Sequence, residues 1–337
     1  MPKASLRARL KTSLRPYWHH IRDNVRLARY AYYDYWRFRK HSGAFPLRTN
    51  AQAQAARITK FYHMVEKGLA LPAPRPGFGH YAIGELCVLL DSEIAQGVRA
   101  PHVGKALECL QAYADFNAAN GGETPAAVFH TLKLGAAAGI GCTSDAVKAV
   151  TREEIREATA FDVERFLATR FSVRQFAGGT IDRATIEAAA RMAQSAPSVC
   201  NRQSARVHVI TDPARRAALL RFQNGNRGFG ETASALAIIT CDLTHFVEPS
   251  ERYQAWVDGG LFAMTFALAL HGLGLGSCFL NWSSPSDNDQ RFRKAMPLGE
   301  TETVITFLAI GTLPEQFTVA RSPRKPLDEV LVLEANS

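Results

Sequence analysis

The sequence predicts a three-layer α/β sandwich over residues 151–337, preceded by an α-helical region. Up to about Val150, apolar residues recur at helical spacing, whereas after Thr151 helical patterns alternate with short apolar runs of strand length. Such alternation is typical of helices packed against the faces of a sheet. The chain has 337 residues, which exceeds the usual domain size of about 100–200 residues, so more than one domain is expected.

The composition is that of a soluble globular protein, with 47% apolar and 21% charged residues. Residues 1–20 lack the apolar core of a signal peptide, so none is expected. The uncharged stretch Leu261–Trp282 contains several glycines, which favours a buried helix ending near His271 and then a buried strand over a transmembrane span. Six scattered cysteines lack disulfide or metal-ligand spacing, so we expect reduced thiols, a cytoplasmic protein and no metal site.

Residues 1–50 form a basic arm. Residues 1–60 carry 14 Lys/Arg against 2 Asp, a balance of +12, and because the whole chain carries +9, the remainder sums to −3. Basic residues beside aromatic ones fit a helix on an anionic membrane surface, where each Lys or Arg contributes roughly 1 kcal/mol. Nucleic acid is a less favoured partner, and packing of the aromatic side on the protein's own body is an equal alternative. The aromatic residues are Tyr17, Trp18, Tyr30, Tyr32, Tyr33, Tyr35, Trp36 and Phe38.

Residues 51–150 are interpreted as a small α-helical domain. Two apolar stripes at helix spacing are followed by a third helix, expected over Gly104–Asn117, and the helical pattern continues to about residue 150. His63 and Glu66 share one helix face just before the Pro/Gly-rich loop Leu71–Gly79. The group could belong to a lid or an anion site, but surface ion pairs beside an interhelical loop are the favoured interpretation. Two potential ligands do not make a metal site.

Residues 151–337 form the predicted sandwich. Thr151 and Glu154 fit a capping box, so a helix is expected to begin there and to run to about Thr169. Beyond it, helices and strands alternate. The expected helices cover residues 182–194, 213–222, 251–270 and 287–294, and the expected strands cover 206–211, 235–241, 275–280 and 301–310.

Two turn-like clusters flank the first of these helices. The first loop, Arg170–Phe176, reads Arg-Phe-Ser-Val-Arg-Gln-Phe, and the second loop, Ala196–Gln203, reads Ala-Pro-Ser-Val-Cys-Asn-Arg-Gln. Arginine and serine side chains suit a phosphate, while an asparagine amide suits a planar hydrogen-bonding ring. Order and spacing resemble the flavin-dependent nitroreductase family, whose loops read Arg-Arg-Ser-x-Arg-x-Phe and Ala-Pro-Ser-x-x-Asn-x-Gln. The resemblance covers about residues 155–332 and implies a mixed sheet flanked by helices.

The resemblance implies a phosphate-binding end. In the first loop, Arg170, Ser172 and Arg174 match the family's phosphate and ribityl contacts. Near the C-terminus, the segment Arg321–Leu327 resembles the family's closing Arg-Lys-Pro-Leu segment. Arg324 is therefore expected to reach the same phosphate.

The resemblance also implies a ring-binding end. Asn226 falls where the family has an asparagine near the pyrimidine edge of the flavin, and Asn281 and Trp282 fall where backbone amides approach flavin N5. The run Gly272–Cys278 resembles the family's Leu-Gly-Leu-Gly-Thr-Cys segment. It is not a dinucleotide fingerprint, because it follows a helix and precedes a strand. The second loop matches the family at Pro197, Ser198, Val199 and Asn201.

The function implied by the resemblance is that of an FMN-dependent oxidoreductase, in which NAD(P)H reduces the flavin and a small organic acceptor takes the electrons. The flavin carries this chemistry, so no catalytic side chain is expected. A homodimer that buries Leu261–Leu270 is also implied. Two alternatives stay open: an FMN-dependent dehydrogenase or oxidase of a biosynthetic intermediate, and a catalytically silent scaffold recruited to a membrane or polyanion. Departures from the family pattern at Phe171, Ser204, Ala205 and Trp282 keep them open.

Overall fold

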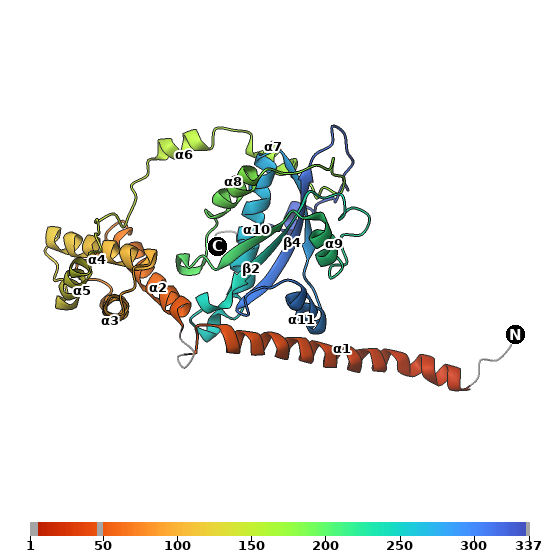
Figure 1. The fold of residues 1–337 in the computed structure, drawn as a ribbon, viewed down its shortest axis with the longest axis horizontal. Helices are drawn as coiled ribbons and strands as arrows, with labels where there is room; N and C mark the ends of the chain where they lie inside the picture. Colours follow the sequence, from red (N-terminus) through yellow and green to blue (C-terminus); the bar gives the residue numbers. More distant parts are fainter. Residues whose placement is uncertain (1–5, 46–49, 335–337) are drawn as a thin grey trace.

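The computed structural model describes residues 6–45 and 50–334, with side chains from Trp18 onward. The first five residues of the predicted arm, its residues 46–49 and the side chain of Tyr17 lie outside the described part. Helices lead through an extended connection to an α/β sandwich (Figure 1). The N-terminal helices are α1 (Leu6–His41), α2 (Ala51–Leu69), α3 (His80–Ala95), α4 (Pro101–Ala119) and α5 (Ala126–Ala137).

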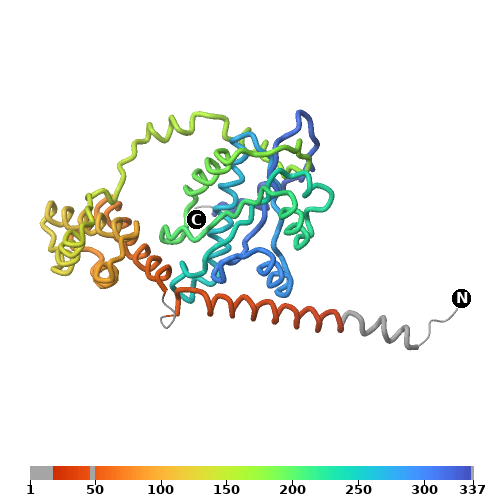
Figure 2. The backbone as a smooth tube through the Cα atoms, viewed as in Figure 1, coloured from red at the N-terminus to blue at the C-terminus, as the bar shows by residue number. Residues whose placement is uncertain are grey.

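Helix α1 runs along one side of the sandwich and extends beyond it (Figures 1 and 2). Near its C-terminal end the Tyr33 hydroxyl donates to Asp289 at 2.7 Å, and Arg37 donates to the main-chain oxygen of Glu302 at 2.7 Å. One side of the arm therefore packs on the protein's own body. Large apolar side chains elsewhere on the helix stay exposed, among them Trp18, Ile21, Val25, Tyr32, Tyr35 and Trp36.

Helices α2–α5 enclose a hydrophobic core of their own. Asn50 begins α2 as an N-cap, because its side chain accepts a hydrogen bond from the Ala53 N–H at 2.8 Å. The expected helices are confirmed, but helical structure to about residue 150 is wrong. The last of these helices ends at Ala137, and Gly139 with φ of 72° takes the left-handed conformation that terminates helices.

The connection to the sandwich contains two short helices where one long helix was expected. The capping box is confirmed: Thr151 Oγ1 accepts from the Glu154 N–H at 3.1 Å, and the Glu154 carboxylate accepts from the Thr151 N–H at 2.6 Å. A continuous helix to Thr169 is wrong. Asp162 caps a second helix, and neither helix has a buried residue, so no packing holds them as one. They are α6 (Arg152–Ala158) and α7 (Val163–Ala168).

Within residues 6–45 and 50–334, the strands form one four-stranded sheet with the order β1-β2-β4-β3, and all neighbouring strands are antiparallel. A parallel bridge between Ser172 and Ser277 makes the pairing mixed. Alternate residues of β2 face opposite sides, so that Ala237 packs with α8 and α10, whereas Ile238 packs with α9 and α11. The predicted three-layer sandwich is confirmed.

The elements of the sandwich begin and end within three residues of their expected bounds. The helix and strand expected within Leu261–Trp282 are confirmed, and none of the described helices is long and apolar enough to span a bilayer. The elements are α8 (Arg183–Ala193), β1 (Ala205–Ile210), α9 (Pro213–Leu220), β2 (Ala235–Asp242), α10 (Gln254–Gly272), β3 (Leu275–Asn281), α11 (Ser286–Ala295) and β4 (Glu302–Thr312), with short 3-10 turns η2 (Val199–Asn201), η3 (Leu243–His245), η4 (Pro249–Glu251) and η5 (Leu327–Glu329).

Candidate functional site

The first loop, Arg170–Phe176, lies against the edge strand β3. The Val173 N–H donates to the Ser277 carbonyl oxygen at 3.0 Å. This close approach depends on Gly276, because a Cβ atom there would lie 3.1 Å from the Val173 side chain. The glycine run Gly272–Cys278 therefore seats the first loop on the sheet.

A cavity of about 600 Å³ lies between the first loop and the C-terminal segment, and we call it the phosphate cavity after the contact predicted from the sequence. Its lining includes Arg170, Ser172, Arg174 and Arg324, all the residues predicted to contact phosphate. Within the described part of the chain, none of these arginines forms an ion pair. Arg324 donates to the Ser322 carbonyl at 2.8 Å. Cations gathered without a carboxylate partner suit an anionic ligand.

The second loop is held in a strained conformation. Cys200, Asn201 and Gln203 have positive φ values of 48°, 51° and 48°, a region that non-glycine residues rarely adopt. Such strain persists only where surrounding structure imposes it, and it clusters at binding and catalytic sites. The loop also lines a cavity of about 100 Å³ beside α10.

Buried groups that were not singled out from the sequence hold this loop. Both carboxylate oxygens of Asp258 accept from the Val199 N–H at 3.2 Å. The fully buried Arg202 guanidinium pairs with Glu251 and donates to the His245 carbonyl at 2.7 Å. Asp258 is the one acidic residue in the sequence of α10, and that isolated charge in an apolar helix was the available signal.

The same burial affects the two carboxylates differently. Burial raises the pKa of Asp258, and the hydrogen bonds from Gln254 and Val199 offset it only in part. Burial also opposes ionisation of Glu251, but the hydrogen bond and the charge of Arg202 outweigh it and lower the pKa. Glu251 is therefore held as the counter-ion of Arg202.

The Asn226 side chain forms hydrogen bonds to the main chain of the segment just before it. Its amide nitrogen donates to the carbonyls of Leu220 at 2.9 Å and Gln223 at 2.6 Å. Its role at a ring edge stays a prediction. Gln223, which the sequence did not single out, is buried. Its side chain donates to the Asn281 carbonyl at 2.9 Å, so it links the segment before Asn226 to the turn after β3.

Trp282 packs its indole in the core. The ring stacks on Phe307 at 4.7 Å between centroids, with 15° between planes, and Nε1 donates to Asp289 at 2.9 Å. The bulky side chain of this residue, which departs from the family pattern, therefore packs inward. The expected ring contact at Asn281 and Trp282 concerns their backbone amides, and it stays a prediction.

The two loops lie toward opposite ends of the sheet. The second loop leads into β1, where Ala205 pairs with Cys241, which in turn pairs with Thr303 of β4. The first loop bridges to Ser277, which pairs with Ile310 of β4. The step from Thr303 to Ile310 along β4 corresponds to roughly 23 Å. Within one chain the predicted phosphate residues lie together, but the second loop lies toward the other end of β4.

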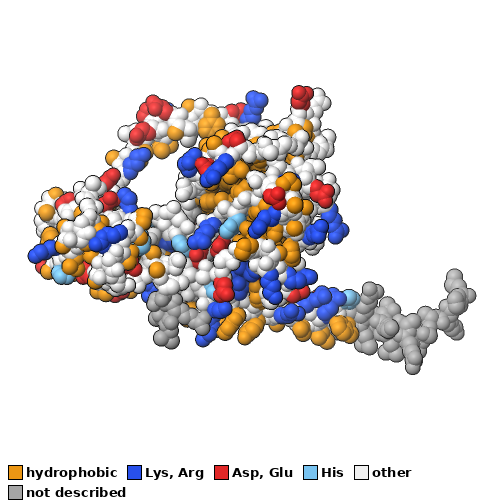
Figure 3. Space-filling view, viewed as in Figure 1, with side chains coloured by type: hydrophobic (Ala, Val, Ile, Leu, Met, Phe, Trp, Pro, Cys, Tyr) orange, Lys and Arg blue, Asp and Glu red, His pale blue; other side chains and the backbone are white. Residues whose placement is uncertain are grey.

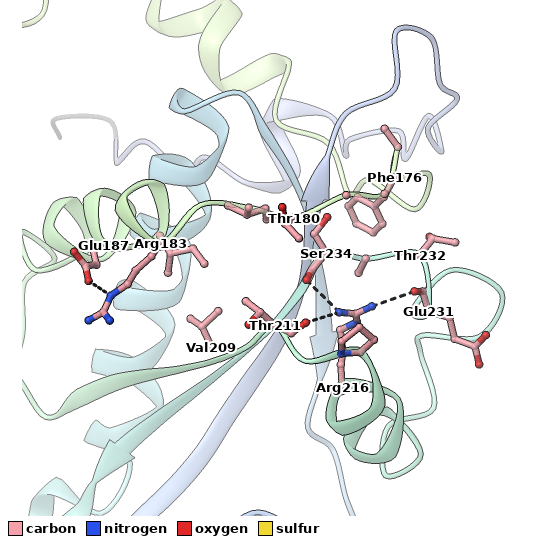
Figure 4. Close-up of a pocket in the computed structure, with 17 residues that line it drawn as sticks. Phe176, Thr180, Arg183, Glu187, Val209, Thr211, Arg216, Glu231, Thr232 and Ser234 are labelled. Atoms are coloured by element: carbon pink, nitrogen blue, oxygen red, sulfur yellow. Dashed lines mark hydrogen bonds and ion pairs between the residues drawn. The ribbon is translucent and has the colours of Figure 1, made fainter.

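A further cavity of about 850 Å³ opens beside α8, β1 and α9 (Figure 4). Arg216 lines it and donates to the main-chain carbonyls of Thr211, Glu231 and Ser234 at 3.1–3.3 Å. This guanidinium holds the surrounding backbone together. Of the predicted site residues, all of which are described, none lines this cavity.

Cysteine and histidine side chains are the remaining candidates for reactive chemistry. All six cysteines lie in the described residues and are free. Burial raises the pKa of Cys109 and of Cys241 to about 12, which makes these thiols poor nucleophiles. His63 and Glu66 form a side-chain pair at 3.1 Å. Among the described residues, no group of three or more His, Cys, Asp or Glu is placed to hold a metal ion.

Comparison with known proteins identifies the part of the chain that carries both loops. Residues 167–312 match the nitroreductase family. A nitroreductase-family domain therefore follows the N-terminal helical extension, as the loop motifs predict. No curated protein matches the chain.

Several solved nitroreductase structures are similar to this chain. The FMN-dependent nitroreductase from Clostridium difficile R20291 is 21% identical, over 47% of this chain and 91% of that one, with a TM-score of 0.40. A putative nitroreductase in complex with FMN from Desulfovibrio desulfuricans is 21% identical, over 53% of this chain and 100% of that one, with a TM-score of 0.45. A putative NADH dehydrogenase/NAD(P)H nitroreductase from Parabacteroides distasonis is 17% identical, over 52% of this chain and 97% of that one, with a TM-score of 0.44.

Proposed function

We propose that the nitroreductase-family domain is an FMN-dependent oxidoreductase that uses NAD(P)H and passes electrons to a small organic acceptor. The phosphate cavity carries the proposal, because Arg170, Ser172 and Arg174 meet Arg324 there although the sequence separates them widely. Four arginines and two serine hydroxyls, with no carboxylate lining the cavity, match the phosphate of a flavin mononucleotide. The family match supports a flavin as the phosphate-bearing group.

In this proposal the second loop and the turn after β3 hold the flavin ring. The Asn201 amide can both donate to and accept from the ring, and the main-chain amides of Asn281 and Trp282 lie toward N5. The flavin supplies hydride acceptance and electron transfer, and the protein supplies position and charge. The ring-side residues proposed are Pro197, Ser198, Val199, Asn201, Asn226, Asn281 and Trp282.

A symmetric homodimer would complete each site. Because the two loops of one chain lie toward opposite ends of β4, a second subunit is needed to bring its second loop to the phosphate cavity of the first. Helix α10 offers a surface for this contact. Val257, Leu261 and Met264 follow helical spacing and are 51%, 42% and 38% exposed, large values for apolar side chains in a central helix.

We further propose a three-part organisation: an arm (residues 1–50), a helical accessory domain (51–150) and an FMN domain (151–337). The protein would be cytoplasmic, with the arm as a peripheral contact to the inner face of the membrane. Hydrophobic side chains gather along the lower edge of α1 in Figure 3, and Lys and Arg side chains lie above them. Among the apolar side chains of α1, Trp18 and Ile21 are 69% and 64% exposed. This arrangement suits an anionic lipid surface better than nucleic acid.

The arm is tested with vesicles. Full-length protein should co-sediment with anionic vesicles, should bind more weakly in 1 M salt, where the Debye length is about 3 Å, and should lose binding when residues 1–40 are deleted. Flavin content should survive the deletion, because every proposed flavin residue lies at or beyond Arg170. Equal binding to neutral vesicles would contradict the electrostatic part of the proposal.

The function is tested by an absorbance spectrum of the purified protein before and after anaerobic NAD(P)H. We expect a flavin spectrum near one FMN per subunit, bleached by NADH or NADPH. A flavin that does not bleach would favour the dehydrogenase or oxidase alternative. A colourless protein that does not take up added FMN would favour the silent scaffold.

A further inference from the structure

The contact between α1 and the sandwich lies directly behind the turn that follows β3. Tyr33 of α1 donates its hydroxyl to Oδ2 of Asp289, a residue of α11, at 2.7 Å. The other oxygen of the same carboxylate, Oδ1, accepts from Trp282 Nε1 at 2.9 Å. A single carboxylate therefore joins the arm to the turn.

This carboxylate is buried and ionised. Asp289 is 8% exposed, and Arg293 donates to it from Nε at 2.8 Å. Burial would raise the pKa of Asp289, but the Arg293 charge and the hydrogen bonds from Tyr33, Trp282 and Arg293 together lower it. Hydrogen bonds to an ionised group are stronger than neutral ones, so the Tyr33 contact is a firm link.

The turn itself is fixed at two neighbouring residues. The Trp282 indole contacts Asp289 through a hydrogen bond and stacks on the face of Phe307. At the residue before it, Gln223 donates to the Asn281 carbonyl at 2.9 Å. Because the indole and the main chain of Trp282 belong to one residue, a shift of Asp289 moves the backbone of the turn.

We propose that Tyr33 is a positioning residue, which acts through Asp289 and Trp282 to set the backbone at Asn281–Trp282. The inference rests on the proposed function, in which this backbone faces flavin N5. The arm then does more than attach the protein to a surface, because its docked side holds the reactive edge of the flavin site in place. A displaced arm would leave the phosphate contacts intact and would loosen the ring end.

The test compares Tyr33→Phe with Tyr32→Phe. Each variant removes one hydroxyl oxygen, but Tyr32 is 64% exposed, and no hydrogen bond of its hydroxyl is seen in the described structure. Hydrogen exchange on the apoprotein should be faster at the backbone of residues 281–284 in Tyr33→Phe alone. In FMN-loaded protein, Tyr33→Phe should shift the flavin absorbance and slow flavin reduction by about tenfold, the order expected for a small misplacement of reacting groups. FMN affinity should be unchanged.

The readouts separate this inference from the proposed function. Equal exchange at residues 281–284 in the two variants would overturn the positioning role, whether or not flavin binds. An apoprotein that takes up no FMN would refute the proposed function. The exchange at residues 281–284 would then still decide whether Tyr33 positions this backbone. Faster exchange in α1 without a change at residues 281–284 would show that Tyr33 only anchors the arm, and it would also overturn the inference.

Discussion

The phosphate end and the ring end of the candidate site use arginine in opposite ways. At the phosphate end, Arg174 and Arg324 are exposed, and each donates to a main-chain carbonyl two residues away. At the ring end, the Arg202 side chain is 0% exposed and Glu251 meets its charge. An arginine neutralised inside the protein serves the fold, whereas exposed arginines without a carboxylate partner remain available to an anionic ligand. An arginine within a motif is therefore interpreted as structural when a carboxylate of the protein neutralises it, and as a candidate ligand contact when none does.

The largest effect is expected at the phosphate end. Arg174→Ala/Arg324→Ala should weaken FMN binding by about 10- to 100-fold for each arginine replaced, since a charge-assisted hydrogen bond to phosphate is worth roughly 1.5–3 kcal/mol. Because both side chains are exposed, the free energy of unfolding of the apoprotein should change by less than about 0.5 kcal/mol. Titration of FMN into the apoprotein and urea unfolding measure the two quantities. Arg191→Ala, an exposed arginine outside the cavity, is the control, and a double variant with full flavin content would refute the assignment.

At the ring end the expected effect is on stability. Glu251→Gln leaves the buried Arg202 guanidinium without its counter-ion, which should lower the free energy of unfolding by about 3–5 kcal/mol. Glu187→Gln breaks the exposed pair with Arg183, whose side chains are 46% and 91% exposed, and should cost less than about 0.5 kcal/mol. Urea unfolding of the two variants decides. If both lose the same small amount, the ring end is not held by this buried pair.

The end of the sheet that carries the second loop should also respond to acid, through Glu302 at the start of β4. Burial of Glu302 opposes ionisation, but His208, Thr240 and Arg206 outweigh it and lower its pKa from 4.5 to about 2. A lowered pKa stabilises the folded state above pH 4.5, and this contribution, on the order of 3 kcal/mol, should be lost as pH falls from 4.5 to 2. Glu302→Gln should flatten the dependence of unfolding free energy on pH in that window. An unchanged slope in this variant would assign the acid sensitivity to other carboxylates.

The sequence displays the residues proposed for the phosphate end more clearly than the residues that support the second loop, for a physical reason. Arg170 and Arg174, which line one cavity, stand close together in the chain, so a local pattern displays them. The support of the second loop, by contrast, joins Arg202 to Glu251 across 49 positions. No local spacing marks that pair, and Arg202 within the motif looks like one more potential ligand contact. Buried support becomes visible only when the fold brings its members together.

The same distinction explains the fold predictions. Helices and strands of the sandwich follow local periodicity and caps such as Asp182, which accepts from the Thr185 N–H at 2.8 Å, and their expected bounds were close. The expected helix from Thr151 to Thr169 failed because its start was encoded locally, but its continuity needed packing that exposed residues do not provide. Periodicity predicts an element where tertiary contacts support it.

The smallest expected effect separates backbone from side chain in the second loop. Asn201 has φ of 51°, a conformation that glycine adopts without strain and that costs alanine roughly 1 kcal/mol. Asn201→Gly and Asn201→Ala both remove the amide, but only the alanine variant should lose stability. If the amide contacts the flavin ring, both variants should bind FMN up to about tenfold more weakly, or should shift its reduction potential, because one hydrogen bond is worth roughly 1 kcal/mol. FMN titration, potentiometry and urea unfolding of the pair give the answer. A glycine variant with unchanged affinity and potential would reduce Asn201 to a turn former, a common role of asparagine in loops.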